Sequence, residues 1–416
     1  MSAADHALAT ELVMGVLRWR SLLDSQIARV SSQPIAKLDQ EIRIALQLAA
    51  YQLGWLDRVP GRAAIHESVE LVKRARKRSA VPFANAVLRK LAAAIAPDSS
   101  ADAHAKAIAA TNSVKDLAAK SAHPGWIVER WMKQFGLAVS RSICAYNQKV
   151  PRTTIRLRDR NAAADLEKEG IELADGDFLA SARRVLSGDV TSTQVFAANR
   201  IAIQDEASQL VAALVGKGKR ILDGCAAPGG KTWSLADRNP EAAIVAVELH
   251  SHRAELLRKR IVAANVKVIT GDLQEFAIGE PFDRVLLDVP CSGTGTLARN
   301  PEIKWKLSRQ DLRDLAARQV ALLRAAMKQV AVGGKLFYST CSLEQEEDES
   351  IVEQALAENT GFHIVDCNSE LERLRAAGEW IAPASVPFVR GAYLRTIPGV
   401  RDCDGFFAAI VGKDRL

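Results

Sequence analysis

The sequence predicts a multidomain chain of mixed α and α/β class, with an all-helical part in front and a doubly wound parallel sheet behind. In the first 95 residues, apolar side chains recur at helical spacing. From about residue 196 onward, short apolar runs alternate with helical stretches, as they do when helices connect parallel strands. With 416 residues, 48% of them hydrophobic and 25% charged, the chain is long enough for two or three domains.

Four amphipathic segments make up the helical front, and prolines at positions 34, 60 and 82 separate them. Trp19 and Trp55 lie in apolar periodic stretches, so we expect both to pack in the core. An Ala-, Ser- and Asp-rich stretch, 97–120, is typical of a connector or a short helical link. The four predicted helices cover residues 9–30, 39–56, 63–77 and 83–95.

The front part also carries a cationic run, with five Lys or Arg residues among the six at 73–78. Such a run can neutralise phosphates, or it can end a helix and complement the helix dipole in solvent. The formal net charge of +7 and a pI of about 9.1 favour a polyanionic partner.

A small α/β segment is predicted between the helical front and the α/β domain. Residues 123–136 form an amphipathic pattern, and residues 151–158 and 171–187 alternate enough to predict short strands. We therefore assign 123–195 to a separate small segment.

The α/β domain contains five predicted strands, at residues 219–224, 242–249, 266–272, 283–289 and 333–340. The first four carry an acidic residue at or near their carboxyl ends, where side chains line the crevice of a doubly wound sheet. Any one of these carboxylates is also consistent with a solvated strand end or a helix cap. As a set they favour cofactor binding, and they are Asp223, Glu248, Asp272 and Asp288.

A glycine-rich turn follows the first of these strands, in the sequence RILDGCAAPGGKT. It predicts a cradle for an adenosyl cofactor at the strand edge. It is not a nucleotide-binding P-loop, because Cys225 stands where that motif requires glycine. Glu248 lies at a spacing that suits ribose hydroxyls, Asp272 is expected near the adenine, and Asp288 near the amino acid part of the cofactor. The cradle residues are Cys225, Ala226, Ala227, Pro228, Gly229, Gly230 and Lys231.

Lys231 has three possible roles. The ammonium group can neutralise a carboxylate, approach the substrate backbone, or remain exposed at a helix start.

Two cysteines, Cys291 and Cys341, come directly after predicted strands, so both thiols should project at one sheet edge. A single cysteine is usually a small apolar filler. However, Pro290 and the Ser-Gly-Thr-Gly run after Cys291 predict a tight turn facing a ligand. A thiolate that adds to carbon 6 of cytosine activates carbon 5 toward methylation. The pattern thus points to covalent methyl transfer to a pyrimidine, with Asp288 hydrogen-bonding base N3.

The motifs DGCAAPGGKT, DVPCSGTGTLARNPEIKW and YSTCS resemble those of the RNA cytosine-5 methyltransferases, and the whole chain resembles the bacterial 16S ribosomal RNA members. The resemblance implies a NusB-like RNA-binding domain (1–122), an RRM-like segment (123–195) and a Rossmann-like class I methyltransferase domain (196–416). It also implies S-adenosylmethionine as cofactor, 16S ribosomal RNA as substrate and 5-methylcytosine as product. By resemblance, Cys341 attacks the base and Cys291 helps to release the product.

Two other functions stay open. In DNA cytosine-5 methyltransferases the Pro-Cys motif carries the nucleophile, which would make Cys291 the attacking residue. A noncatalytic RNA-binding regulator would use only the helical front. Arg299 and Lys304 are candidates for steering the RNA backbone, or belong to an ordinary charged loop.

The remaining features predict a reduced, cytoplasmic protein that is a monomer with no stable protein partner. The six cysteines form no C-x-x-C pair and have no histidine at ligand spacing, so we expect no metal site. No signal peptide is recognisable, and no uncharged run approaches the roughly 18 residues of a membrane span. Disulfides and membrane association are therefore not expected.

Overall fold

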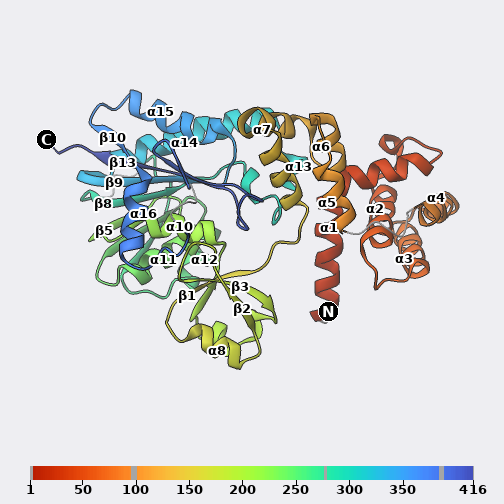
Figure 1. Ribbon diagram of the computed structural model, residues 1–416, viewed down its shortest axis with the longest axis horizontal. Helices are drawn as coiled ribbons and strands as arrows, with labels where there is room; N and C mark the ends of the chain where they lie inside the picture. Colours follow the sequence, from red (N-terminus) through yellow and green to blue (C-terminus); the bar gives the residue numbers. More distant parts are fainter. Residues whose placement is uncertain (1–2, 95–100, 276–278, 384–387, 416) are drawn as a thin grey trace. The chain divides into compact units, whose positions relative to one another are not determined.

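A computed structural model describes residues 3–94, 101–275, 279–383 and 388–415 (Figure 1). The chain divides into two compact units. The helical unit contains Met1–Val150 together with Leu297–Lys306, and the sheet unit contains Pro151–Thr296 and Leu307–Leu416.

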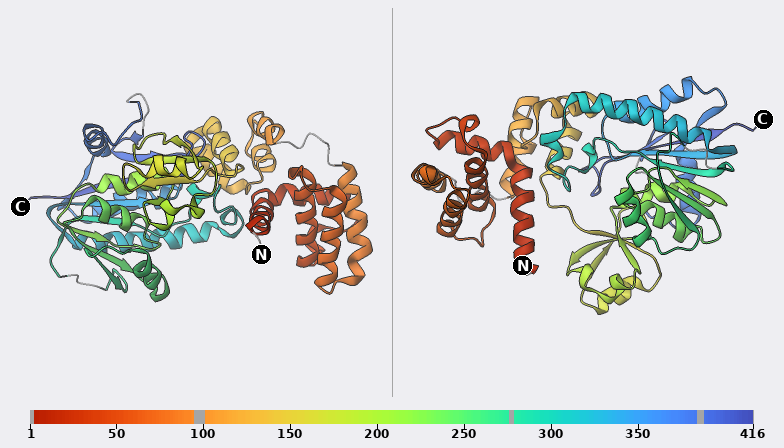
Figure 2. Two further views of the ribbon diagram at one scale, coloured as in Figure 1. Left: turned by 90° about the horizontal axis from the view of Figure 1, so that it is seen from below. Right: turned by 180° about the vertical axis from the view of Figure 1, so that it is seen from behind.

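The helical unit confirms the four predicted front helices, which pack against one another around a single apolar cluster (Figure 2). Trp19 is buried in this cluster, and the ring of Trp55 lies 5.2 Å from that of Trp19. Within the predicted connector, 97–120, the described residues 101–120 form two short helices, in agreement with the alternative of a short helical link; residues 97–100 lie outside the described residues. The helices are α1 (Ala3–Val30), α2 (Gln40–Trp55), α3 (Gly61–Arg74), α4 (Val81–Ala94), α5 (Ala101–Ala109), α6 (Val114–Lys120), α7 (Gly125–Asn147) and, from the later segment, α13 (Ile303–Lys306).

The cationic run lies at the carboxyl end of α3, as a helix-ending run does. Lys73 pairs with Glu70 at 2.6 Å, and Lys77 pairs with Asp39 at 2.8 Å. Part of the positive charge of this run is therefore already paired with carboxylates.

The sheet unit begins with a small antiparallel sheet in the strand order β2-β3-β1-β4. The short strands expected at 151–158 and 171–187 are present, and a further strand, β4, follows after residue 195. The helix α7 belongs to the helical unit, whereas the small sheet begins after residue 150. The elements are β1 (Thr154–Leu157), α8 (Ala162–Lys168), β2 (Glu172–Asp175), β3 (Ala182–Ser187), α9 (Gln194–Ala197) and β4 (Ile201–Ile203).

The larger sheet has nine strands within the described residues, and its main path runs β11-β12-β13-β9-β8-β5-β6-β7. All five predicted strands are confirmed, and they are parallel to one another. These strands are β5 (Arg220–Asp223), β6 (Ala243–Glu248), β7 (Val266–Thr270), β8 (Phe282–Asp288) and β9 (Val330–Thr340). Four further strands, antiparallel to their neighbours, are β10 (Phe362–Val365), β11 (Val389–Arg390), β12 (Tyr393–Thr396) and β13 (Phe406–Lys413).

Helices cover both faces of this sheet (Figures 1 and 2), which explains why its strands read as continuous apolar runs. Ile221 of β5 packs in one apolar cluster with α10, α11 and α16, and the next residue, Leu222, packs in the other with α14 and α15. The helices of this unit are α10 (Glu206–Val215), α11 (Gly230–Arg238), α12 (Ser251–Arg260), α14 (Arg309–Lys328), α15 (Glu349–Ala357) and α16 (Cys367–Ala376).

The strand order reverses between β5 and β8, because the chain continues from β5 toward β6 and β7 on one side and from β8 toward β9 on the other. In an open α/β sheet, the crevice beside such a reversal is where ligands bind, outside the carboxyl ends of the strands. The acidic strand ends and both cysteine turns therefore meet at this edge.

Candidate active site

The glycine-rich turn connects β5 to α11, and its backbone requires glycine at position 229. Gly229 has a φ of +104°, and a Cβ there would lie 2.6 Å from the Leu257 side chain. Asp223, only 1% exposed, lies below the turn and accepts a hydrogen bond from Thr232 Oγ1 at 2.7 Å. Burial raises the pKa of Asp223 to about 6. This carboxylate thus ties the end of β5 to the first turn of α11 and is not part of the cavity lining.

A cavity of about 580 Å³ opens beside the turn, at the carboxyl ends of the parallel strands. It brings together most of the predicted site residues, although Ala226 is buried behind the surface. Pro228, Gly229, Gly230 and Lys231 form the rest of the turn and the start of α11 without lining the cavity. The predicted residues in the lining are Cys225, Ala227, Glu248, Asp272, Asp288, Cys291 and Cys341.

Two carboxylates in the lining are held by the loops that follow their strands. Glu248 accepts a hydrogen bond from the backbone N–H of His250 at 3.0 Å, and its Oε1 lies 3.6 Å from Nη1 of Arg253. Asp272 accepts from the backbone N–H of Gln274 at 2.9 Å. Both side chains are thus fixed at the cavity wall.

Asp288 forms an ion pair with Lys231, whose Nζ lies 2.7 Å from Oδ2. The other oxygen of Asp288 accepts from Ser339 Oγ at 2.7 Å. Although burial acts against the charge of Lys231, Asp288 and Cys341 raise the pKa of this lysine overall. The prediction that Lys231 neutralises a carboxylate is confirmed, and a stable cation lies close to Cys341.

The two cysteine sulfurs lie 3.3 Å apart in the cavity wall and do not form a disulfide. The hydrogen bond to Cys341, together with burial and the nearby charges of Cys341 and Glu347, raises the pKa of Cys291 well above its ordinary value. The two sulfurs are thus close enough to share a hydrogen bond, in which either thiol can be the donor.

Comparison with known proteins agrees with this geometry. Residues 212–411 match the family described as 16S rRNA methyltransferase RsmB/F, and residues 1–93 match the NusB family. A Bacillus subtilis protein named probable ribosomal RNA small subunit methyltransferase B is 32% identical, over 99% of this chain and 92% of the relative. The chain belongs to the RsmB/F methyltransferase family.

Other relatives and solved structures extend the match. The ribosomal RNA small subunit methyltransferase B of Pseudomonas syringae is 32% identical, over 99% of this chain and 91% of the relative. The crystal structure of PH0851 superposes with a TM-score of 0.77 at 24% identity, covering 99% of this chain and 91% of that one. The crystal structure of NSun6 from Pyrococcus horikoshii superposes with a TM-score of 0.60 at 20% identity, covering 71% of this chain and 100% of that one. Both structures share the fold of this chain.

An RsmB/F methyltransferase uses S-adenosylmethionine, and the residues of the cavity fit this cofactor. The sulfonium centre of the cofactor is a cation, and the lining supplies the carboxylates of Glu248, Asp272 and Asp288. Gly224 also lets the backbone line the cavity closely, because a Cβ there would lie 2.9 Å from Leu273 and 3.0 Å from Leu287.

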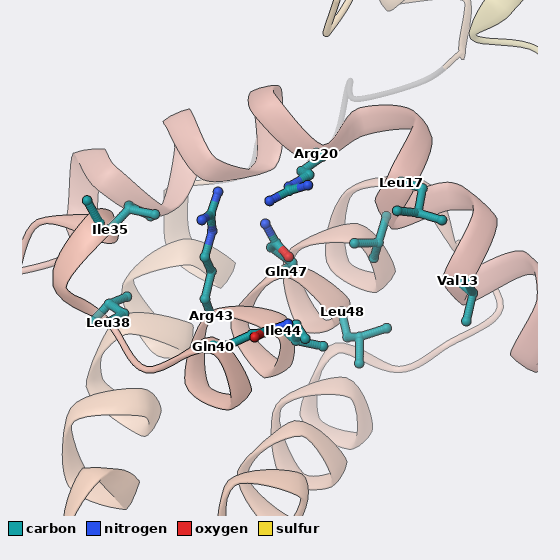
Figure 3. A pocket seen from close by; sticks show the side chains of 12 residues that line it. Val13, Leu17, Arg20, Ile35, Leu38, Gln40, Arg43, Ile44, Gln47 and Leu48 are labelled. Carbon is teal, nitrogen blue, oxygen red and sulfur yellow. The ribbon is translucent and has the colours of Figure 1, made fainter. Parts of the chain in front are cut away.

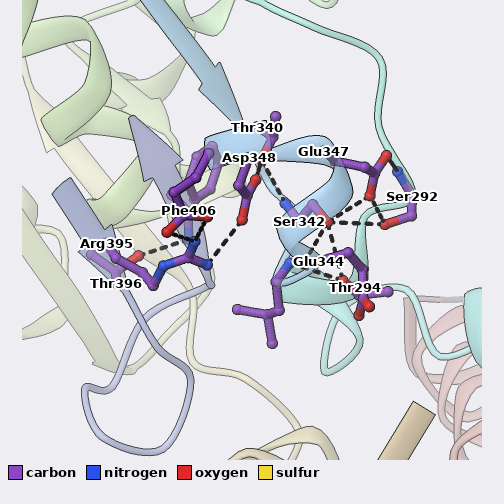
Figure 4. Close-up of polar contacts among 12 residues, drawn as sticks. Ser292, Thr294, Thr340, Ser342, Glu344, Glu347, Asp348, Arg395, Thr396 and Phe406 are labelled. Carbon is purple, nitrogen blue, oxygen red and sulfur yellow. Dashed lines mark hydrogen bonds and ion pairs between the residues drawn. The ribbon is translucent and has the colours of Figure 1, made fainter. Parts of the chain in front are cut away.

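A buried polar network behind the cysteines of this RsmB/F chain was missed by the sequence analysis (Figure 4). Glu347 contacts the turns that carry both cysteines, and Asp348 accepts from Thr340 and pairs with Arg395. In the sequence these acids belong to the run EQEEDE, which is typical of a solvated helix start. Nothing local to that run indicates which of its carboxylates turn inward.

The prediction that Lys304 steers RNA is wrong, because this side chain is only 1% exposed within the helical unit. Its Nζ donates to the backbone carbonyls of Arg18 at 2.6 Å and Ala122 at 3.0 Å. Trp305 beside it donates from its indole to the carbonyl of Leu17 at 2.6 Å. The segment Leu297–Lys306 is therefore an integral part of the helical unit, and a role for Arg299 stays a prediction.

A second cavity, of about 620 Å³, lies in the helical unit between α1 and α2 (Figure 3). Its lining is mostly apolar, and Arg43 in its wall is paired with Asp24. No carboxylate lines this cavity in the described residues, so it lacks the groups that suit a sulfonium cofactor.

The remaining predictions concern metal ions and membranes. Within residues 3–94, 101–275, 279–383 and 388–415, no group of three or more His, Cys, Asp or Glu side chains is arranged to hold a metal ion. Over the same ranges, none of the helices is long and apolar enough to span a membrane.

Proposed function

We propose that this methyltransferase transfers a methyl group from S-adenosylmethionine to carbon 5 of a cytosine in 16S ribosomal RNA, through a covalent adduct between Cys341 and carbon 6 of the base. The observation that carries the proposal is the pair of thiols 3.3 Å apart in the wall of the carboxylate-lined cavity. The names of the full-length relatives support a small-subunit ribosomal RNA substrate.

The chain holds the cofactor with the turn from Cys225 to Lys231 and with the carboxylates that follow it at the strand ends. We assign the ribose hydroxyls to Glu248, the adenine side to Asp272 and the amino acid part to Asp288. When bound, S-adenosylmethionine supplies an electrophilic methyl group.

Cys341 is the nucleophile in this proposal. The Cys341 thiol gives its proton to a base and its sulfur forms a bond to carbon 6. The displaced electrons of the carbon 5–carbon 6 double bond make carbon 5 nucleophilic, so that carbon 5 can take up the methyl group. The Lys231 ammonium stabilises negative charge at this side of the cavity, because its raised pKa keeps it protonated. The Asp288 carboxylate, held by Lys231 and Ser339, accepts a hydrogen bond from base N3 when that nitrogen carries a proton in the adduct.

Cys291 serves the release step. After methyl transfer, a base removes the carbon 5 proton, the electrons of that C–H bond restore the ring double bond, and the carbon 6–sulfur bond breaks. The electron pair stays on the Cys341 sulfur, to which the protonated Cys291 donates a hydrogen bond from 3.3 Å. We favour Cys341 over Cys291 as the attacking residue because of the resemblance of the YSTCS motif to that of the RNA cytosine-5 methyltransferases.

The other parts of the proposal concern the whole chain. We assign RNA contact to the helical unit and treat the division 1–122, 123–195 and 196–416 as a working domain scheme. A cytoplasmic, monomeric protein remains our prediction.

Nucleoside mass spectrometry of 16S RNA that lacks its natural methylation tests the proposal, with native protein or Cys341→Ala. We expect new 5-methylcytidine from the native protein alone, and an RNA–protein adduct that persists on a denaturing gel with Cys291→Ala. Product from Cys341→Ala would reverse the cysteine roles. If the native protein neither methylates the RNA nor binds S-adenosylmethionine, the alternative of a noncatalytic RNA-binding regulator replaces the proposal.

A further inference from the structure

Glu347 has a fully buried side chain that lies between the two cysteine turns. Its Oε1 accepts from the backbone N–H of Ser292 at 2.8 Å and from Gln319 Nε2 at 3.0 Å. Its Oε2 accepts from Ser342 Oγ at 2.6 Å and from Ser292 Oγ. Ser292 directly follows Cys291, and Ser342 directly follows Cys341, so one carboxylate binds both turns (Figure 4).

The neighbouring carboxylate, Asp348, is equally buried but has a counter-ion. Arg395 approaches Asp348 to 2.9 Å, whereas no lysine or arginine of the described residues pairs with Glu347. A buried charge is costly unless it is paired or fully hydrogen-bonded. The four donors around Glu347 therefore meet the requirement of a buried anion, and three of them belong to the cysteine turns.

The rest of the network keeps Glu347 in place relative to both turns. Tyr338 donates from its hydroxyl to the backbone carbonyl of Glu347 at 2.6 Å. The turns also bond directly, since the N–H of Gly295 donates to the carbonyl of Cys341 at 2.9 Å. A movement of the Glu347 side chain would thus change the position of one cysteine relative to the other.

We propose that Glu347 is a positioning residue that holds the Cys291 turn against the Cys341 turn, so that the Cys291 thiol meets the Cys341 sulfur when the methylated base is released. The role of Cys291 in this sentence rests on the proposed function. Glu347 lines no part of the cavity and acts through Cys291. Its negative charge also contributes to the raised pKa of Cys291.

The first test compares Glu347→Gln with Glu346→Gln, which removes the same charge from an exposed neighbouring side chain. An amide turns one acceptor of the network into a donor facing other donors. In single-turnover reactions we expect Glu347→Gln to slow product release about tenfold or more and to accumulate the RNA–protein adduct, as Cys291→Ala does. Glu346→Gln should release product at the native rate.

A double-mutant cycle separates positioning from general damage. If Glu347 acts through Cys291, the double variant Glu347→Gln/Cys291→Ala releases product no more slowly than Cys291→Ala. If instead the two substitutions slow product release by factors that multiply in the double variant, and Glu347→Gln accumulates no adduct, the inference is wrong. Ser342→Ala, which removes one of the four donors to Glu347 and keeps the carboxylate, should show a smaller effect in the same direction and serves if Glu347→Gln does not fold.

A second measurement does not depend on the reaction. Diamide takes one hydrogen from each of two adjacent thiols and is reduced to the hydrazine as the disulfide forms, so the rate of Cys291–Cys341 coupling reports their alignment without RNA. We expect coupling about tenfold slower in Glu347→Gln than in native protein or Glu346→Gln. Equal rates would refute positioning. A native protein that couples its thiols but makes no 5-methylcytidine would refute the proposed function alone.

Discussion

Gly295 offers a direct test of how closely the two cysteine turns must approach. A Cβ at this buried position would lie 2.2 Å from the carbonyl oxygen of Gly405 and 2.8 Å from that of Cys341. Both are backbone atoms that cannot rotate away. The Gly295 N–H donates to Cys341 at 2.9 Å, and the Gly405 N–H donates to the Gly295 carbonyl at 2.8 Å. Gly295→Ala must therefore separate three chain segments.

The cost follows from these contacts. Two backbone hydrogen bonds contribute about 1 kcal/mol each, and overpacking a buried site costs about 1–3 kcal/mol. We expect the free energy of unfolding of the sheet unit to fall by about 3–5 kcal/mol, which a domain with a total of about 5–15 kcal/mol can survive. Because the Cys341 turn is displaced, methyl transfer should fall more than the folded fraction does.

Urea unfolding and single-turnover methylation measure the two effects on the same preparation. Gly361→Ala is the matched control, because a Cβ there meets nothing within 4 Å. If Gly295→Ala matched this control in both unfolding free energy and methylation rate, the close approach of the turns would be needed neither for stability nor for methyl transfer.

Three further changes test other contacts. Lys231→Met leaves Asp288 without its counter-ion, so we expect methyl transfer to fall by about tenfold or more; a native rate in single-turnover assays would contradict this. The pKa of Asp223 is raised to about 6, so between about pH 4 and 6 the folded protein binds more protons than the unfolded chain does. The free energy of unfolding should therefore fall by up to about 3 kcal/mol as pH rises through this range. Asp223→Asn should abolish that slope in urea unfolding, and an unchanged slope would assign it to another group. Burial lowers the pKa of Lys304 well below its ordinary value, so the unfolded chain binds a proton that the folded protein does not. The helical unit should therefore gain stability as pH rises toward 10. In thermal unfolding, Lys304→Met should flatten this rise in stability, and an equal rise in both proteins would contradict the argument.

Much of the candidate active site was predictable because its determinants are local in the sequence. Parallel strands covered on both faces read as apolar runs, and the residues that follow them must meet at one edge. Asp288, Cys291 and Cys341 could be placed together from that rule alone. The antiparallel strands β10–β13 were not predicted, since their assignment depends on pairing with β9 rather than on a local pattern.

The buried charges were not predictable, because inward orientation depends on partners far along the chain. Glu347 is buried by donors 55 residues away, and Lys304 by a carbonyl 182 residues away. In the sequence both belong to charged stretches that are typical of solvated loops. Only the folded arrangement separates them from the exposed residues beside them.

The helical unit is completed by Leu297–Lys306, a segment that comes about 150 residues after the rest of that unit. On the ribosome, Lys304 and Trp305 reach the carbonyls of α1 only after most of the sheet unit has been synthesised. At about 5–20 residues per second, this delay is on the order of ten seconds. During that time the front helices lack these side-chain contacts, so the order of synthesis makes the completion of the helical unit depend on the stretch that follows the Cys291 turn.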